Sequence, residues 1–372
     1  MWTRATCLGA ALFIFVILLA RDAKAGRGPA STAFFYGPAV PRELFDHYDR
    51  VVVDPDHVPT PPRGAGAQAF AYVSLGEVHP SRPWRTALPE RLVLGRDAAF
   101  GSEIVDTSSS AWAAFVLDRV VSPLHAQGYR GFFFDTLDSY RKLSPTPAQA
   151  AAHVAGLAAI VRAVKRRHPD ARILLNRGFE LLPSVAGAVD GVVAESLFES
   201  YDHASRRYVP VAAREREALL ALLREVTKRH GLPVTVIDYV PATDPDKRAD
   251  TARRILRAGF EPWVTGPALD EIGVGRVRVV PRKVMVVHRH EPTEGYLGVQ
   301  DACVLVAPVL EHLGFVPEYV DVRGGLPARN LAGQYAGVVL FLPDGGAEDD
   351  GTARWIARQV DSGLRIAFLH GF

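Results

Sequence analysis

Cysteine and excess charge of either sign are scarce in this sequence. The chain has two cysteines in 372 residues, and its 43 Lys and Arg residues nearly balance 41 Asp and Glu residues, leaving a formal net charge of +2. A chain so close to neutrality gives no reason to expect nucleic acid or a strongly anionic membrane surface as a partner. With 48% hydrophobic and 23% charged residues, the composition is that of an ordinary globular protein.

Several signatures of catalysis are missing as well. No two histidines stand four residues apart, so the zinc-protease helix and the His-x-x-x-His of metal-dependent deacetylases are excluded. The sequence has neither the Gly-x-Ser-x-Gly turn of serine hydrolases nor a glycine loop of the kind that binds phosphate. The one histidine cluster, His288-Arg289-His290-Glu291, follows an expected strand, and we do not expect it to bind a metal. No metal and no organic cofactor is expected.

The N-terminus has the three parts of a secretory signal. Arg4 precedes an apolar run from Cys7 to Ala20, and Ala23-Lys24-Ala25 supplies small residues where a signal peptidase cleaves. An uncleaved anchor helix is the alternative, but the run is short for the ~20 residues that span a bilayer. We expect residues 1–25 to be removed and the protein to be secreted or periplasmic, with no stable membrane span. Cleavage leaves Cys303 alone, so the exported chain must be held together by its core rather than by disulfides.

Apolar runs of strand length recur eight times between residues 33 and 266, with helical patterns between several of them. Eight strands with intervening helices over roughly 240 residues match a (β/α)8 barrel in number and in length. The alternative, an open doubly wound sheet, needs no eighth strand and usually has a glycine-rich first turn, which is absent here. The expected strands are 33–37, 50–54, 68–77, 131–135, 172–178, 191–196, 233–239 and 260–266, and the expected helices are 41–48, 111–127, 146–167, 211–230 and 246–258.

A second α/β unit is expected after the barrel. Its strands are expected at 283–287, 319–322, 337–341 and 365–369, and its helices at 298–313 and 352–361. This pattern resembles the first half of an open, flavodoxin-like sheet and stops directly after a strand, so we expect a truncated gene product or a fragment. The predicted organisation is a signal peptide (1–25), a barrel (31–278) and an incomplete flavodoxin-like domain (283–372).

Two carboxylates follow apolar strands at what should be one rim of the barrel. Asp135 ends the fourth expected strand, and Glu195 lies at the end of the sixth. Active sites of such barrels lie at the C-terminal ends of the strands, and a pair of acids is the minimum needed to cleave a glycosidic bond. A strand-end acid can also simply cap the next helix. Asp138 could replace Asp135 as the catalytic acid, although capping the short turn that follows is the simpler role.

Polar and aromatic side chains at or just past the other strand ends complete a candidate sugar site. Hydroxyls and amides can bond sugar hydroxyls, and aromatic rings can cover the apolar faces of sugars. Arg177 next to a carboxylate would keep that carboxylate ionised, as a nucleophile requires. The candidate substrate-binding residues are Tyr36, Tyr72, Ser74, Glu77, Asp138, Asn176, Arg177, Tyr201, Asp238 and Tyr239, with Thr265 at the end of the last strand.

Three segments resemble the bacterial endo-α-1,4-polygalactosaminidase-like glycoside hydrolases. They are residues 72–77 (Tyr-Val-Ser-Leu-Gly-Glu), residues 131–138 together with Tyr140, and residues 194–196 (Ala-Glu-Ser). The resemblance covers residues 33–276 and implies a barrel that cuts α-1,4-linked galactosamine or N-acetylgalactosamine polysaccharide internally, with retention. By motif position it implies Asp135 as the nucleophile and Glu195 as the acid/base, with the pKa of Glu195 raised by partial burial. It also implies that exopolysaccharide export machinery is a partner.

Two other functions stay open from the sequence. The barrel could bind polysaccharide, or act as a secretion scaffold, without turnover, and the intact strand-end acids argue against this alternative. It could also hydrolyse another glycan by the same mechanism. An enzyme shortens the polymer, whereas a binding protein only retains it.

Overall fold

The computed structural model describes residues 30–62, 66–290, 295–342 and 350–369. Residues from Ser31 onward belong to one compact unit. The predicted signal peptide, residues 1–25, lies outside the described residues and stays a prediction.

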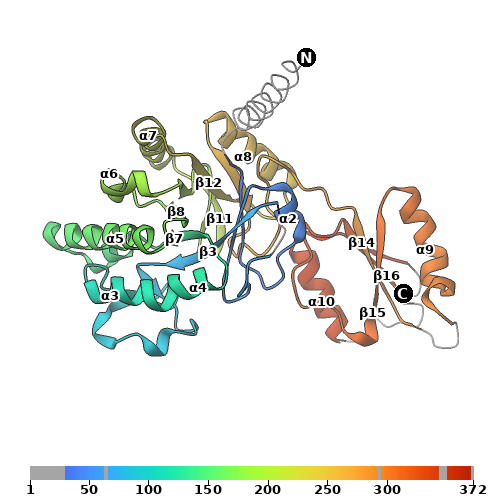
Figure 1. Ribbon diagram of the computed structural model, residues 1–372. Helices are drawn as coiled ribbons and strands as arrows, with labels where there is room; N and C mark the ends of the chain where they lie inside the picture. Colours follow the sequence, from blue (N-terminus) through green and yellow to red (C-terminus); the bar gives the residue numbers. More distant parts are fainter. Residues whose placement is uncertain (1–29, 63–65, 291–294, 343–349, 370–372) are drawn as a thin grey trace, which may run out of the picture. The chain divides into compact units, whose positions relative to one another are not determined.

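Eight parallel strands form a single sheet that curves into a nearly closed barrel (Figure 1). Each strand pairs with the next in the order β1-β2-β3-β7-β8-β9-β12-β13. Just beyond the two end strands, the backbone N–H of Tyr36 donates to the carbonyl of Leu269 at 2.6 Å. The predicted (β/α)8 barrel is therefore confirmed. The strands are β1 (Thr32–Phe35), β2 (Arg50–Val53), β3 (Gln68–Ser74), β7 (Gly131–Asp135), β8 (Arg172–Asn176), β9 (Gly191–Glu195), β12 (Val234–Tyr239) and β13 (Glu261–Thr265).

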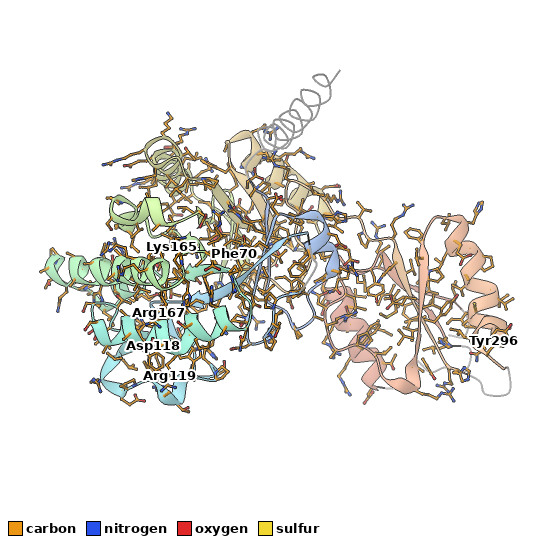
Figure 2. All side chains as sticks on the ribbon, viewed as in Figure 1. Phe70, Asp118, Arg119, Lys165, Arg167 and Tyr296 are labelled. Atoms are coloured by element: carbon orange, nitrogen blue, oxygen red, sulfur yellow. The ribbon has the colours of Figure 1, made fainter. Side chains whose placement is uncertain are left out.

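Helices surround the sheet, which is why the barrel strands are buried on both faces rather than alternating with polar residues. The rings of Phe34 and Phe133 meet edge to face inside the barrel, with centroids 5.4 Å apart. On the outside, an ion pair of 3.4 Å joins Arg167 of α5 to Asp118 of the neighbouring helical segment (Figure 2). The helices are α2 (Arg42–His47), α3 (Ser110–Phe115), α4 (Ser122–Ala126), α5 (Pro147–Arg167), α6 (Leu182–Val185), α7 (Ala213–His230) and α8 (Pro245–Arg257).

Within the described residues, α5 is the helix that is long and apolar enough to cross a membrane by length and composition. Its apolar side is occupied in this fold. Leu157, Ile160, Val161 and Val164 are fully buried in the barrel core. We therefore interpret α5 as a core helix.

The loops above the barrel differ from the expectation in three places. The third strand ends at Ser74, and Glu77 instead begins a small antiparallel sheet of β4 (Glu77–Val78), β6 (Ser102–Val105) and β5 (Val93–Asp97). A hairpin of β10 (Glu199–Asp202) and β11 (Arg207–Pro210) follows β9 where no regular structure was expected. The helix expected over 111–127 is divided by a π-helical segment, Val116–Val121, between α3 and α4.

The C-terminal part contains a four-stranded parallel sheet with the order β15-β14-β16-β17. Counted along the chain this order is 2-1-3-4, as in the flavodoxin-like sheets. Val284 and Val286 pack with α9, whereas Met285 and Val287 pack with Trp355 of α10, so the two helices cover opposite faces (Figure 1). The elements are β14 (Lys283–His288), α9 (Asp301–His312), β15 (Val316–Asp321), β16 (Gly337–Phe341), α10 (Asp350–Asp361) and β17 (Ile366–Phe368).

Candidate active site

A cavity of about 930 Å³ opens at the C-terminal ends of the barrel strands. Its floor is formed by inward-facing residues of β3, β7, β8, β9 and β12, and its walls by the loops above them. Of the residues selected from the sequence, Tyr36, Tyr72, Ser74, Glu77, Asp135, Asp138, Asn176, Arg177, Glu195 and Tyr239 line this cavity.

Asp135 accepts hydrogen bonds on both carboxylate oxygens. Its Oδ1 accepts from Asn176 Nδ2 and from the backbone N–H of Thr136, both at 2.7 Å. Its Oδ2 accepts from the phenol of Tyr72 at 2.9 Å. Three donors therefore hold the carboxylate at the end of β7 in one orientation and favour its ionised form.

Glu195 lies close to Asp135, at the end of β9, with only β8 between their two strands. The same Asn176 Nδ2 donates to Glu195 Oε1 at 2.9 Å, and the phenol of Tyr239 donates to Oε2. One amide nitrogen therefore bridges the two acids. Asp135 Oδ1 and Glu195 Oε1 can therefore be no further apart than the sum of these two hydrogen-bond lengths. That sum is below ~6.5 Å, the smallest separation of two carboxyl groups that leaves room for a water between them.

Burial raises the pKa of both carboxyl groups. For Asp135, the bonds from Asn176, Thr136 and Tyr72 oppose that rise. For Glu195, the negative charge of Asp135 adds to the rise, and Tyr239, Asn176 and Arg177 oppose it. Asp135 accepts hydrogen bonds from three donors, whereas Glu195 accepts from two and lies beside the negative charge of Asp135.

Glu77 lines the cavity and connects the inserted antiparallel sheet to the loop after β7 by hydrogen bonds. Its carboxylate is buried and accepts from Ser139 Oγ at 2.5 Å, from Lys142 Nζ at 2.7 Å, and from Ser102. Lys142 also pairs with Asp97 of β5. Glu77 therefore joins the inserted antiparallel sheet to the loop after β7.

Two expectations about charged residues need correction. Arg177 was expected beside the nucleophile, but its charge opposes the raised pKa of Glu195, and its Nη1 lies 4.0 Å from Asp138 Oδ2. Asp138 does precede the short helix Ser139–Leu143, but its side chain makes no capping hydrogen bond. It is instead about half exposed in the cavity wall.

Three further residues selected from the sequence do not line the cavity. Asp238 is fully buried, and its carboxylate accepts from the backbone N–H groups of Leu197, Phe198 and Glu199, so it has no face for a substrate. Successive residues of a strand point to opposite faces, so Tyr239 inside the barrel puts Asp238 outside. Thr265 is also fully buried, and the ring of Tyr201 packs against Tyr208 in the β10–β11 hairpin.

Sequence reasoning missed part of the cavity wall. Asp54 lies directly after the apolar run of β2, which is the same signal that identified Asp135, and it lines the cavity. Arg82, Trp84, Phe100 and His203 also line it from the inserted loops. No sequence pattern pointed to these four, because their positions depend on how the loops fold over the barrel.

A close pair of carboxylates at the C-terminal rim of a (β/α)8 barrel is the arrangement that glycoside hydrolases use. The family model of glycoside-hydrolase family GH114 matches residues 23–281, which is more than half of the chain, and the protein belongs to this family. The predicted resemblance is thereby confirmed.

Two solved structures of a glycoside hydrolase domain agree with this assignment. The glycoside hydrolase domain of PelA from Pseudomonas aeruginosa is 31% identical, covers 66% of this chain and 98% of that domain, and superposes with a TM-score of 0.61. A variant of the same domain gives 30% identity, the same coverage and a TM-score of 0.60. An uncharacterised protein of Deinococcus radiodurans is 32% identical over 244 residues, covering 60% of this chain and 75% of that protein.

Proposed function

We propose that the protein is an exported, endo-acting hydrolase of α-1,4-linked galactosamine or N-acetylgalactosamine polysaccharide, acting with retention of anomeric configuration. The observation that carries the proposal is the bridging of Asp135 and Glu195 by one amide nitrogen. Carboxyl groups of retaining enzymes are ~5–5.5 Å apart, whereas inverting enzymes hold them ~6.5–9.5 Å apart. The two oxygens that share the amide nitrogen are closer together than the second range, which supports retention.

The environments of the two acids support different roles. Asp135, with three hydrogen-bond donors, is the ionised nucleophile, and Glu195, beside that negative charge, holds the proton. In the first step an oxygen of Asp135 attacks the anomeric carbon, the bond to the leaving oxygen breaks, and Glu195 protonates that oxygen. In the second step Glu195 takes a proton from water, the water oxygen attacks the anomeric carbon, and the ester to Asp135 breaks.

The size and lining of the cavity are compatible with an oligosaccharide substrate. A volume of about 930 Å³ lies near the top of the ~300–1,000 Å³ range of small-molecule sites. Trp84 and the half-exposed Phe100 line it from the inserted loops and offer apolar surfaces to sugar rings. The choice of galactosamine rests on the resemblance of residues 72–77, 131–138 and 194–196 to polygalactosaminidase-like enzymes.

The direct test is incubation of the purified protein with defined galactosamine and N-acetylgalactosamine oligomers, followed by mass spectrometry. Shortening from internal positions is expected, and the anomer released first, observed by NMR, should be the α form. Retention of the oligomers without cleavage would indicate a binding protein or scaffold. Cleavage of a different glycan alone would keep the mechanism and overturn the substrate.

Export is tested separately. The charged start, the apolar run and Ala23-Lys24-Ala25 predict cleavage after Ala25. N-terminal sequencing of secreted or periplasmic protein should find Gly26 first. Recovery of the protein in the cytoplasm with an intact Met1 would contradict the proposal of export.

A further inference from the structure

Arg82 is held in one orientation at the cavity wall by two carboxylates from the loop after β2. Its Nη1 donates to Asp54 Oδ1 and to Asp56 Oδ2, both at 2.7 Å, and its Nη2 donates to Asp54 Oδ2 at 3.1 Å. Only 17% of the side chain of Arg82, and 17% of that of Asp54, is exposed. A planar guanidinium with a bidentate carboxylate partner has little rotational freedom.

The guanidinium lies over the ring of Tyr72, with its central carbon 5.5 Å from the ring centroid. Tyr36 packs on the same ring, with centroids 5.1 Å apart, and Phe133 lies 6.2 Å away. The phenol of Tyr72 donates to Asp135 Oδ2 at 2.9 Å. A continuous series of contacts therefore connects the loop after β2 to the proposed nucleophile on β7.

The charge of Arg82 acts on this phenol in a definite direction. Burial and the neighbouring Asp135 raise the pKa of Tyr72 well above its usual value, whereas the positive charge of Arg82 opposes the rise. A phenol in a positive field is a stronger hydrogen-bond donor, and a stronger donor stabilises the ionised carboxylate that accepts from it.

We propose that Arg82 is a positioning residue for the nucleophile: it fixes the ring of Tyr72 and, through the phenol, favours the ionised form of Asp135. The proposal rests on the proposed roles of Asp135 and Glu195 and extends them to a residue that does not touch the acid pair. A purely structural Arg82, which only ties two loops together, would affect stability and leave the ionisation of Asp135 unchanged.

Several other groups face Asp135 and must be held constant in the test. Glu195 of β9 and Asp138 after β7 are acids, Tyr36, Tyr72 and Tyr239 are phenols, and Asn176 and the N–H of Thr136 are neutral donors. Replacing Arg82 removes none of these groups, so a change in the ionisation of Asp135 reports the loss of the Arg82 charge and of its contact with Tyr72. The replacement removes a positive charge and leaves Asp54 and Asp56 unpaired, and both effects raise the pKa of Asp135.

The test compares Arg82→Met with Arg141→Met. Arg141 is a matched control, because its guanidinium also lies over a tyrosine ring, 5.6 Å from the centroid of Tyr140, and pairs with Glu180, but it does not line the cavity. In Arg82→Met the acid limb of kcat/KM should move up by about 0.5 to 1 pH unit, a fraction of the ~1–3 units caused by a charge in direct contact. At a pH on that limb kcat should fall about 3- to 10-fold with KM nearly unchanged, and Arg141→Met should match the parent.

A double variant shows whether the effect passes through Tyr72. If it does, Arg82→Met should shift the acid limb little in a Tyr72→Phe background. Arg82→Lys keeps the positive charge, so its acid limb of kcat/KM should lie close to that of the unsubstituted protein. The proposal is overturned if folded Arg82→Met has the same acid limb of kcat/KM as the unsubstituted protein. It is also overturned if the substitution raises only KM. If Arg82→Met does not fold, Arg82→Gln, which keeps a donor for Asp54, serves in its place.

A measurement without substrate separates this inference from the proposed function. The ionisation of Asp135 can be followed by ¹³C NMR of its side-chain carboxyl carbon, assigned with Asp135→Asn. If the parent cleaves no oligomer but Arg82→Met raises the pKa of Asp135, the proposed function fails and the role of Arg82 stands. If the parent cleaves the polymer and the pKa of Asp135 does not move, the role of Arg82 fails alone.

Discussion

Asn176 is the residue on which the spacing of the acid pair depends. Its amide nitrogen donates to one oxygen of Asp135 and one of Glu195, so both of its protons are used within the site. The two carboxylates stay close without a cation between them, because Asn176 and the phenols of Tyr72 and Tyr239 supply neutral donors. Burial raises the pKa of both acids, and the negative charge of Asp135 adds to the rise for Glu195.

Substitutions of the two acids are expected to fail differently. Asp135→Ala removes the group that forms the covalent intermediate, so turnover should fall by at least about 10³-fold with binding of oligomers retained. Glu195→Ala should spare substrates whose leaving group needs no protonation, and azide should rescue it by replacing water in the second step. Steady-state kinetics with aryl glycosides and oligomers measures both.

Asp138→Ala is the control for this assignment. Asp138 lies in the cavity wall and makes no capping bond, so its loss should change KM more than kcat. Loss of turnover in Asp138→Ala, together with near-normal turnover in Asp135→Ala, would move the nucleophile to Asp138. Equal activity of all three variants and the parent would contradict the two-acid mechanism.

At the scale of elements, the β10–β11 hairpin is anchored to the barrel by a buried carboxylate. Asp238, on the outer face of β12, accepts from three consecutive backbone N–H groups where the chain enters β10. These bonds satisfy donors that the barrel would otherwise bury without partners. The residue selected from the sequence as a substrate contact thus has a structural role.

Asp238 should make stability depend on pH. Burial raises its pKa from 3.8 to about 6, although the three backbone donors oppose the rise. An acid whose pKa is raised in the folded state contributes stability below its unfolded pKa, and this contribution is lost as the pH rises through its folded pKa. The free energy of unfolding should therefore fall by up to about 3 kcal/mol between pH 4 and pH 7 on account of this group. Urea unfolding should show that Asp238→Asn removes this component, whereas Glu217→Gln, at an exposed position of α7, keeps it.

The turn between β3 and β4 allows no side chain at Gly76. A Cβ there would lie 2.0 Å from the carbonyl oxygen of Thr136, and the Gly76 N–H donates to Thr136 Oγ1 at 2.8 Å. Gly76→Ala should therefore push away the residue next to Asp135, lowering stability by about 2 kcal/mol or more and lowering activity with it. Gly187→Ala is the matched control, since a Cβ there meets nothing within 4 Å. Equal thermal unfolding of the two variants would show that the turn can relax.

At the scale of the whole molecule, the described hydrophobic residues form separate cores. One cluster contains residues from Ala33 to Val279 and fills the barrel and its helices. Two smaller clusters, between Val284 and Ile366, lie on the two faces of the C-terminal sheet. All residues of the candidate active site come from the first part of the chain.

The barrel should therefore function without the C-terminal sheet. A fragment of residues 26–282 is expected to be soluble and to keep kcat/KM within about twofold of the full chain, because domains with their own core fold independently. Size-exclusion chromatography, thermal unfolding and oligomer cleavage test this expectation. An insoluble or inactive fragment would show that the predicted boundary near residue 282 is wrong.

The sequence by itself determined the barrel and singled out its two candidate acids, Asp135 and Glu195. Both signals are local: apolar runs of strand length recur eight times, and two of them end on a carboxylate. The strands and helices of the C-terminal part were predictable for the same reason, since each has its own pattern of hydrophobic residues.

Only the tertiary structure decided how the acids are spaced, which polar residues share their cavity and which are structural. The bridging of Asp135 and Glu195 depends on the parallel pairing of β7, β8 and β9, which places Asn176 on the strand between the two acids. The outward direction of Asp238 depends on the register of β12. The contact of Arg82 with Tyr72 depends on how the inserted loop folds over β3. Such contacts join residues far apart along the chain, and hydrophobic periodicity carries no information about the distance between them.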